Sequence, residues 1–378
     1  GANEVPRQFA VITTQVLSRM TFNIGFLWLL AIPGVPYILF QICDLPFIFA
    51  VGAICLLLCV YFTGQEILGR FEIDDLENRP VFVTGCDSGF GKELAIKLLE
   101  RGIPTFAGCL TKKGSEDLEK LSRKLPGHLN TVIIDVSSDE SVRNVAMYLE
   151  NATESYGGLH AVVNNAGVVG SSFFDDLLTT REYKDVAEVN TYGVIRVTQA
   201  LKHLVKKTKG RIVTVSSICN RLGIMGFGPY TVSKYAVTGY CEVIRQELSF
   251  FDVSVHIIEP GFFKTPMIDA KIVQERLDTM WKDAPLTVKE EYGEKFFRDS
   301  RDRAAVLLDK IGSADVHLVV ETYFHAITAR FPRLRYQVGA DAKFIFLPLS
   351  MVPCGLRDAV FRVVDMVSGA PVPASALK

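Results

Sequence analysis

The sequence lacks the residue patterns that mark metal centres, disulfide frameworks and nucleic-acid-binding surfaces. Its six histidines form neither a His-x-His nor a His-x-x-x-His pair, so the spacing gives little support for a metal site. Its eight cysteines include no Cys-x-x-Cys pair, and Cys55 and Cys59 lie in the most apolar stretch, which indicates reduced and mostly buried thiols. Lysine and arginine are scattered and the formal net charge is −1, so nucleic acid is not an expected partner.

The bulk composition is that of a globular protein with a sizeable core. The chain has 378 residues, of which 49% are hydrophobic and 22% are charged, and it contains neither an internal repeat nor a low-complexity segment. This length suits one large domain with appendages.

Two long runs without charge occupy the N-terminal part of the chain. Residues 22–42 and 46–63 contain no charged residue, and Asp44 lies between them. Each run approaches the roughly 20 residues that a membrane-spanning helix needs. A signal peptide or a buried core helix is the alternative, but two adjacent runs without a small-residue cleavage site fit neither well. We therefore expect a membrane anchor in this region.

The anchor divides the N-terminal region into three expected parts. They are a tail (1–21), a membrane-anchoring hydrophobic segment with one or two spans (22–63) and a linker (64–78). If the two runs form a helical hairpin, Arg7 and Arg19 lie on the same side of the membrane as the main domain. The positive-inside tendency makes that side cytosolic.

Short apolar β-rich runs alternate with helical patterns through the middle of the chain. Such alternation predicts an α/β fold with a doubly wound parallel sheet of Rossmann type, covered by helices on both faces. The runs that we expect to form strands lie within residues 80–85, 104–110, 130–136, 159–167, 210–217 and 253–261.

A glycine-rich pattern stands where the first of these strands meets its helix. In Thr84-Gly85-x-x-x-Gly89-x-Gly91, Gly85 permits a tight turn, Gly89 a close backbone approach and Gly91 close helix packing. Backbone amides at such a helix N-terminus bind a diphosphate. A purely structural turn is the alternative, but Asp135-Val136 and the sequence Asn-Asn-Ala-Gly at 164–167 follow later strands at the edge where such a sheet binds its ligand.

A tyrosine and a lysine are spaced for acid–base chemistry in "GPYTVSKYAVTGYC". On a helix Tyr230 lies one turn before Lys234 and on the same face, whereas Tyr235 is rotated by roughly 100° and Tyr240 lies more than one turn further on. A nearby ammonium group favours the phenolate and makes Tyr230 a usable general acid or base. An ordinary amphipathic helix is the alternative for this pair taken alone.

Several motifs occur together and in order between residues 79 and 270. They are the glycine pattern, Asn-Asn-Ala-Gly, the asparagine of "EVNTYG", a serine thirteen residues before Tyr-x-x-x-Lys, and a Pro-Gly after the next strand. This stretch resembles the short-chain dehydrogenases/reductases. The resemblance implies a nicotinamide cofactor across the sheet and a catalytic group of Asn190, Ser217, Tyr230 and Lys234. Ser217, and not Ser216, has the family's spacing.

The resemblance also assigns roles to this group. Lys234 is expected to bond the nicotinamide ribose and to lower the pKa of Tyr230, which takes the proton of a substrate hydroxyl while hydride leaves for the cofactor. Ser217 is expected to hold the substrate oxygen. Asn190 is expected to support a water that links Lys234 to solvent.

The expected cofactor is NAD, with NADP as the alternative. The second strand ends without an acidic residue directly at its end, and Lys112 and Lys113 follow near the place of a 2′-phosphate, although a solvated turn explains them at least as well. The residues that the resemblance assigns to the cofactor are Gly85, Asp87, Ser88, Gly89, Phe90, Gly91, Asp135, Val136, Asn165, Ala166, Gly167, Tyr230, Lys234, Pro260, Gly261 and Thr265.

Within the family, the stretches "VTGCDSGFGKELA", "EPGFFKTP" and "HAITARFPRLRY" resemble the branch of retinol and hydroxysteroid dehydrogenases, to which 3-hydroxybutyrate dehydrogenase is related. The N-terminal flank is most similar to type 2 17-beta-hydroxysteroid dehydrogenases. The branch implies a catalytic core (79–265), a segment with a substrate lid and the remaining core (266–340), and a C-terminal apolar segment and tail (341–378).

The expected activity is oxidation of an apolar secondary or allylic alcohol, a hydroxysteroid or retinol, by a membrane-bound enzyme. The expected location is the endoplasmic reticulum with a cytosolic catalytic domain, or a mitochondrial membrane. One alternative is a 3-hydroxybutyrate dehydrogenase, for which Arg221 would supply a cationic group, and another is a non-catalytic cofactor-binding scaffold. A homodimer through helices 182–207 and 229–249 is expected, with membrane lipid as a further partner.

Overall fold

The computed structural model describes residues 47–171, 173–266 and 270–377. The chain divides into two compact units, residues 1–73 with 329–332 and residues 74–328 with 333–378, which are described separately. The first predicted apolar run, residues 22–42, lies outside the described residues.

The described part of the first unit contains the helix α3 (Phe47–Gly69). Its window Gly52–Gly69 has a mean hydropathy of 1.5 and none of it is buried, so this helix is long and apolar enough to cross a membrane. The helix continues past residue 63 into the expected linker because Gln65, Ile67 and Leu68 keep the helical pattern, and the linker shortens accordingly.

The second unit is built on a parallel sheet, as predicted. The described residues form seven strands in the order β3-β2-β1-β4-β5-β6-β7, with every neighbouring pair parallel. The strand order reverses between β1 and β4, and a doubly wound sheet binds its ligand at that point. The strands are β1 (Val81–Thr84), β2 (Thr105–Cys109), β3 (Leu129–Ile133), β4 (Ala161–Asn164), β5 (Arg211–Val215), β6 (Ser254–Pro260) and β7 (Arg335–Val338).

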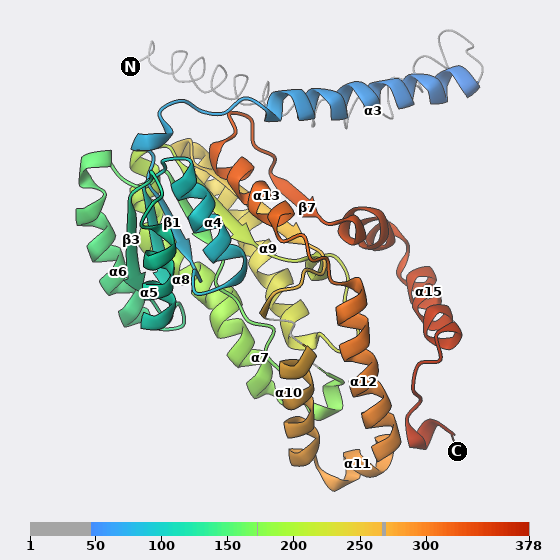
Figure 1. Cartoon of the computed structure of the whole chain (residues 1–378). Coiled ribbons are helices and arrows are strands. Elements are labelled where there is room, and N and C mark those ends of the chain that lie inside the picture. The colour runs from blue at the N-terminus through green and yellow to red at the C-terminus, as the bar shows by residue number, and fades with distance from the viewer. Residues whose placement is uncertain (1–46, 172, 267–269, 378) are drawn as a thin grey trace, which may run out of the picture. The chain divides into compact units, whose positions relative to one another are not determined.

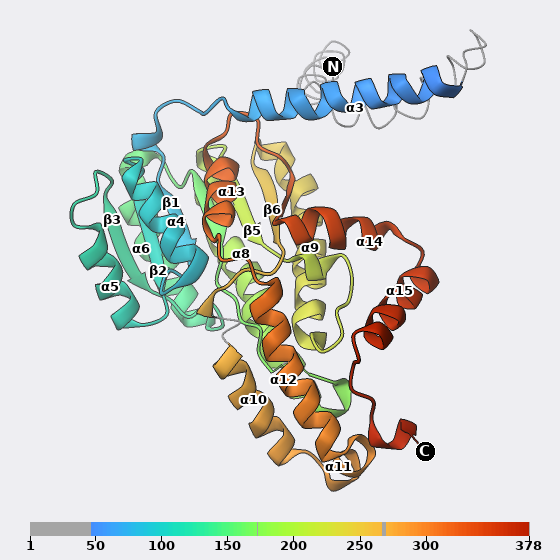
Figure 2. The same ribbon diagram turned by 45° about the vertical axis from the view of Figure 1, so that its right-hand side comes forward.

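Helices cover both faces of the sheet (Figures 1 and 2), and strands such as β1, β2 and β5 are accordingly buried at every position. Apolar side chains form one core cluster on each face. One face carries α4 (Gly89–Glu100), α5 (Lys112–Ser122) and α13 (His317–Thr328). The other carries α6 (Asp139–Ala152), α8 (Val194–Lys207) and α9 (Gly228–Leu248); α7 (Thr180–Ala187) leads into α8 through a π-helical turn, Glu188–Gly193.

The segment that follows β6 is helical, and its role as the substrate lid stays a prediction. Its helices are α10 (Ala270–Asp283), α11 (Leu286–Tyr292) and α12 (Glu294–Ile311). A small apolar cluster joins α10 and α12 to Phe173, and in it Trp281 stacks on Phe297 with ring centroids 4.5 Å apart. The chain then returns to the core with α13 and β7.

Residues after β7 are helical. A π-helical turn (Ala342–Phe346) leads into α14 (Leu347–Met351), and α15 (Cys354–Val367) follows. The strand β7 was not predicted, because four residues with two charged or amide side chains give a weak strand pattern.

Candidate active site

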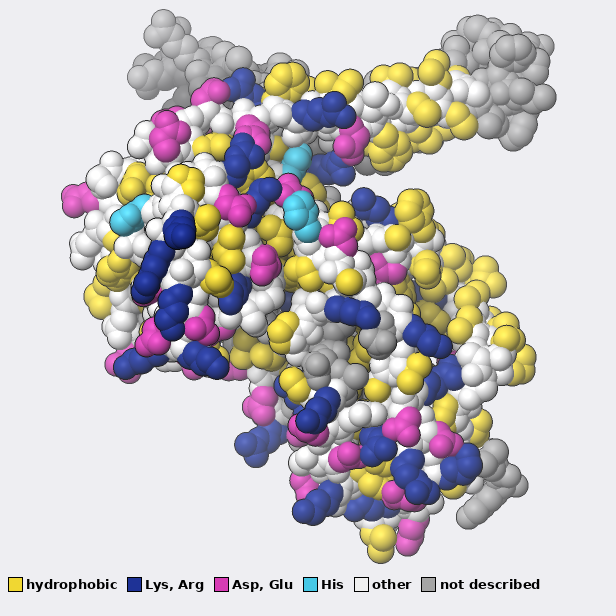
Figure 3. Space-filling view, in the orientation of Figure 1, with side chains coloured by type: hydrophobic (Ala, Val, Ile, Leu, Met, Phe, Trp, Pro, Cys, Tyr) yellow, Lys and Arg dark blue, Asp and Glu magenta, His cyan; other side chains and the backbone are white. Residues whose placement is uncertain are grey.

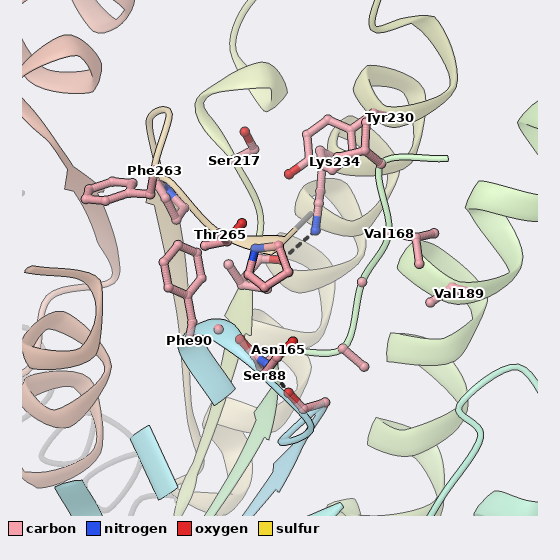
Figure 4. Close-up of a pocket in the computed structure, with 18 of the residues that line it drawn as sticks. Ser88, Phe90, Asn165, Val168, Val189, Ser217, Tyr230, Lys234, Phe263 and Thr265 are labelled. Atoms are coloured by element: carbon pink, nitrogen blue, oxygen red, sulfur yellow. Dashed lines mark hydrogen bonds between the residues drawn. The ribbon is translucent and has the colours of Figure 1, made fainter. Parts of the chain in front are cut away.

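A cleft of about 470 Å³ opens at the carboxyl ends of the strands. Figure 4 shows Ser217, Tyr230 and Lys234 on one side of it and Ser88, Phe90 and Asn165 on the other. The predicted site residues line this cleft, with two exceptions: Gly91 and Asn190 do not.

The glycine loop connects β1 to α4. Gly85 and Gly89 have φ angles of +73° and +59°, which side chains disfavour. A Cβ atom on Gly91 would lie 2.3 Å from the carbonyl oxygen of Gly85, so Gly91 lets the helix pack against the loop from behind the cleft. The loop and the N-terminus of α4 therefore present backbone to the cleft, which fits a diphosphate.

The next wall is held by hydrogen bonds between β1 and β4. The Thr84 hydroxyl accepts the backbone N–H groups of Asn165 and Ala166, at 3.0 and 3.1 Å. The Asn165 amide donates to the carbonyl oxygen of Thr84 at 2.9 Å. The Tyr323 hydroxyl donates to Oδ1 of Asn165 at 3.0 Å. The side-chain amide of Asn165 therefore bonds to the protein and holds the two strands together at the cleft.

Asp87 in the glycine loop reaches the end of β2. Its Oδ2 accepts the backbone N–H of Leu110 at 2.7 Å, and its Oδ1 accepts both the N–H and the hydroxyl of Thr111, at 2.9 and 2.7 Å. Asp87, Leu110 and Thr111 all line the cleft. Lys112 and Lys113 follow in the first turn of α5, where they are exposed and are not among the described residues that line the cleft.

Two adjacent serines after β5 have different partners. The Ser216 hydroxyl is buried, donates to the carbonyl oxygen of Lys234 at 3.1 Å and pairs with the Thr238 hydroxyl at 2.8 Å. The Ser217 hydroxyl accepts the N–H of Cys219 at 3.2 Å, and Ser217 lines the cleft together with Tyr230. The Ser216 hydroxyl is thus engaged within the protein, and the role of Ser217 as the catalytic serine stays a prediction.

Tyr230 and Lys234 lie one turn apart on α9. The Lys234 ammonium donates to the carbonyl oxygen of Val215 at 3.1 Å and lies 5.4 Å from the centre of the Tyr230 ring. Burial lowers the pKa of Lys234 to about 8. Burial also raises the pKa of Tyr230.

The expected lowering of the Tyr230 pKa by Lys234 is not found, because burial of the phenol raises this pKa instead. The spacing in the sequence correctly placed the two side chains on one face of the helix α9. It did not reveal how deeply that face is buried. A phenolate at this position needs additional positive charge.

Asn190 stands behind the cleft wall, in the π-helical turn. It is fully buried, its Oδ1 accepts the N–H of Val168 at 2.8 Å, and its amide donates to the Val168 carbonyl oxygen at 2.8 Å and to Ser233 at 3.0 Å. These contacts position the Val168 backbone in the cleft wall. The predicted water relay through Asn190 stays a prediction.

Sequence reasoning missed a buried carboxylate next to Pro260. Glu259 is fully buried, and its Oε2 accepts two bonds from Arg221, at 3.0 and 2.9 Å, and one from Gln337 at 2.6 Å. Its Oε1 accepts from Asn220 at 2.7 Å and from Arg335 at 2.9 Å. The signal in the sequence is an acidic residue at the end of the strand-forming run "VSVHIIEPG".

Another missed group fixes the turn after β6. The Asp341 carboxylate accepts the N–H of Phe262 at 2.8 Å, and a Cβ atom on Gly261 would lie 2.2 Å from its oxygens. Gly261 is therefore needed for this close approach, and the pair places Pro260 and Thr265 at the cleft.

The family model described as short chain dehydrogenase matches residues 79–276. The chain belongs to the short-chain dehydrogenase family. It is 41% identical over 294 residues to 17-beta-hydroxysteroid dehydrogenase type 6 of Mus musculus, covering 78% of this chain and 91% of that protein. It is 40% identical over 308 residues to retinol dehydrogenase 16 of Homo sapiens, covering 82% and 94% respectively. The predicted retinol and hydroxysteroid branch is confirmed.

Solved structures confirm the short-chain dehydrogenase fold. A short chain dehydrogenase/reductase from Burkholderia phymatum in complex with NAD superposes with a TM-score of 0.57 at 21% identity, covering 79% of this chain and 98% of that one. A short chain dehydrogenase from Burkholderia cenocepacia in complex with NADP gives 0.55 at 22% identity, covering 76% and 98%. With its family, its relatives and this cleft, the chain is an NAD(P)-dependent dehydrogenase.

Proposed function

We propose that this short-chain dehydrogenase is a membrane-bound enzyme that oxidises an apolar secondary or allylic alcohol, a hydroxysteroid or a retinol, with NAD. The observation that carries the proposal is the meeting of Ser217, Tyr230 and Lys234 in one cleft with the glycine loop. A non-catalytic scaffold would have no need for that meeting.

In the proposed reaction the bound nicotinamide accepts the hydride. Ser217 donates a hydrogen bond to the substrate oxygen, and Tyr230 removes the proton of the substrate hydroxyl. Lys234 holds the nicotinamide ribose and supplies positive charge beside the phenol. Because burial raises the pKa of Tyr230, a phenolate there needs positive charge beside it, which Lys234 supplies and a bound oxidised nicotinamide would increase.

The walls around the reacting groups favour an apolar substrate. Val168, Val189, Ile218 and Phe227 line the same cleft as Ser217 and Tyr230. Such a surface desolvates a hydrocarbon skeleton and leaves a few polar groups to orient its hydroxyl. The names of the relatives, a hydroxysteroid and a retinol dehydrogenase, agree with this substrate class.

A small hydroxy acid such as 3-hydroxybutyrate fits this cleft less well. Its carboxylate needs a cationic partner, and Arg221 was the candidate. The Arg221 guanidinium is instead paired with the buried Glu259, and Lys234 is the sole cationic side chain among the described residues that line the cleft.

Two surfaces support attachment to a membrane. The first is the apolar helix α3. The second is the exposed apolar face of the helix α15. The other face of this helix, with Arg357, Phe361 and Asp365, is half-buried. Figure 3 shows hydrophobic atoms gathered over the C-terminal helices. The exposed apolar side chains at helical spacing on α15 are Leu356, Val360, Val363, Val364 and Val367.

The proposed location is the endoplasmic reticulum with the catalytic unit in the cytosol, and a mitochondrial membrane belongs to the hydroxy-acid alternative. Carbonate extraction of membranes from expressing cells tests attachment. Retention in the pellet is expected, and release into the supernatant would contradict it.

A homodimer through α9 is part of the proposal. Val232, Tyr235 and Val243 are exposed along this helix, as expected for a surface that a second copy covers. Light scattering of the detergent-solubilised protein should give twice the protomer mass. Val243→Glu should give a monomer, and an unchanged mass for that variant would contradict an interface at this site.

The experiment that tests the activity measures NAD reduction by the purified, detergent-solubilised protein with estradiol, testosterone, retinol and 3-hydroxybutyrate. Turnover of a steroid or of retinol is the expected result. Turnover of 3-hydroxybutyrate alone would favour the hydroxy-acid alternative, and cofactor binding without turnover of any alcohol would favour the scaffold.

A further inference from the structure

We propose that Asp87, a residue of the glycine loop, selects NAD over NADP by standing in for the acidic residue that is missing from the end of β2. The proposal rests on the proposed function to the extent that the cleft binds a nicotinamide cofactor. It concerns the adenosine end of that cofactor and is independent of the alcohol.

The position of Asp87 is the first argument. In a doubly wound sheet the diphosphate lies at the glycine loop, and an acid at the end of β2 meets the ribose hydroxyls of the adenosine. Here β2 ends at Cys109 and the next residues are Leu110 and Thr111, which are not acidic. The carboxylate of Asp87 is bonded to the backbone of both and lines the cleft with them.

The residues around Asp87 leave room for its carboxylate and fix its orientation. A Cβ atom on Gly114 would lie 2.4 Å from Asp87 Oδ1, so the absence of a side chain in the first turn of α5 lets the carboxylate reach this place. Thr111 caps α5 and donates its hydroxyl to the same oxygen. The carboxylate is held in one orientation by three donors.

The hydrogen-bond capacity of Asp87 fits a ribose. An ionised carboxylate has about four acceptor positions, and protein donors use two on Oδ1 and one on Oδ2. Oδ2 therefore retains capacity to accept a hydroxyl of the adenosine ribose. A 2′-phosphate would instead bring a dianion to a fixed negative charge.

The contacts of Asp87 and the positions of two nearby lysines also disfavour a 2′-phosphate. The N-terminus of α5 would be an anion site, but the carboxylate of Asp87 already accepts the Thr111 N–H there. Lys112 and Lys113 are exposed on α5 and do not line the cleft. Their presence in the sequence therefore does not indicate NADP.

The test measures dissociation constants of NAD and NADP by calorimetry on the detergent-solubilised full chain, without an alcohol. Asp87→Ser removes the charge, and Glu116→Gln is the matched control, since Glu116 is an exposed acid on α5 outside the cleft lining. Wild type should bind NAD more tightly. In Asp87→Ser the NAD-to-NADP affinity ratio should fall by about tenfold or more, because like-charge contacts cost several kcal/mol.

Glu116→Gln should keep the wild-type ratio. Equal losses for both cofactors in Asp87→Ser would show that Asp87 only holds the loop together and would overturn the proposal, as would a wild-type preference for NADP. A second measurement compares the dissociation constants of NAD and of its 2′-deoxy analogue with the wild-type protein. It therefore does not depend on a variant that folds. Weaker binding of the analogue supports the proposal, and equal binding overturns it.

These readouts also separate the two proposals. If the protein oxidises no alcohol but still prefers NAD over NADP, only the proposed function is contradicted. If alcohol oxidation is normal but Asp87→Ser keeps the wild-type preference between NAD and NADP, only this inference is contradicted.

Discussion

The carboxyl edge of the sheet and the α10–α12 lid are held by different forces. At the edge, buried polar groups form hydrogen bonds across strands, as Thr84 does with Asn165 and Glu259 does with Arg335. In the lid, Trp281, Phe297 and their apolar neighbours form a small cluster, and ion pairs such as Arg301 with Asp278 lie at the surface.

This difference separates two tasks. Hydrogen bonds are directional, so the edge can hold catalytic groups in fixed positions. Apolar packing tolerates changes of shape, so the lid can be adapted to one or another hydrocarbon without disturbing the chemistry. Changes at the edge should therefore affect turnover or folding, and changes in the lid should affect the choice and affinity of substrate.

The largest effect is expected at the edge from Tyr230→Phe. Loss of the hydroxyl removes the acid–base group, and the rate of alcohol oxidation should fall by about 10²–10⁴-fold. Binding of NAD, measured by calorimetry, should change little, because the phenyl ring still fills the same space. Retained turnover would contradict the mechanism, and a parallel loss of NAD binding would indicate a disturbed fold.

The next effect is on the free energy of unfolding. Glu259→Ala leaves Arg221 and Arg335 without their buried partner and should destabilise the protein by about 3–5 kcal/mol. Glu242→Ala is the matched control, since Glu242 pairs with the same Arg335 but its side chain is 43% exposed, and it should cost at most about 1 kcal/mol. Chemical denaturation measures both, and equal losses would contradict a network centred on Glu259.

Acid should weaken the sheet before the lid. Burial lowers the pKa of His160 and of His256 to about 3, so both are neutral in the folded protein. The unfolded chain protonates them near pH 6.5, and stability is therefore lost as the pH falls below that value. At pH 5 each should cost about 2 kcal/mol. Unfolding followed between pH 7 and pH 5 measures this, and a flat profile would contradict it.

The smallest effect is expected in the lid. Trp281→Ala removes the ring that stacks on Phe297 and should raise KM for a steroid or retinol by about tenfold, with little change in kcat. Leu286→Ala, at an exposed position of α11, is the control and should leave both constants unchanged. A large fall in kcat with an unchanged KM would mean that the lid positions the reacting groups as well.

The edge of the sheet was largely predictable from the sequence, because its parts are local patterns. Apolar runs gave the strands β1 to β6, and the glycine loop and the Tyr230–Lys234 spacing each lie within one element. The choice of Ser217 over Ser216 also followed from spacing, and the Ser216 hydroxyl is engaged with Lys234 and Thr238.

What the sequence left unresolved depends on residues far apart in the chain. Asp87 reaches Thr111 across 24 positions, so a search for an acid at the end of β2 could not find it. Glu259 gathers Arg221 and Arg335 from two other segments, and the burial that raises the pKa of Tyr230 comes from the assembled cleft. Such contacts are properties of the fold and have no local pattern.

The central claim, hydride transfer from an apolar alcohol at the Tyr230 site, is tested most directly by isotope transfer. The purified protein is incubated with NAD and with estradiol or retinol deuterated at the carbinol carbon, and the NADH is examined by mass spectrometry. Deuterium should appear in NADH with the wild type and not with Tyr230→Phe. NADH without deuterium, or equal labelling by the variant, would contradict the claim.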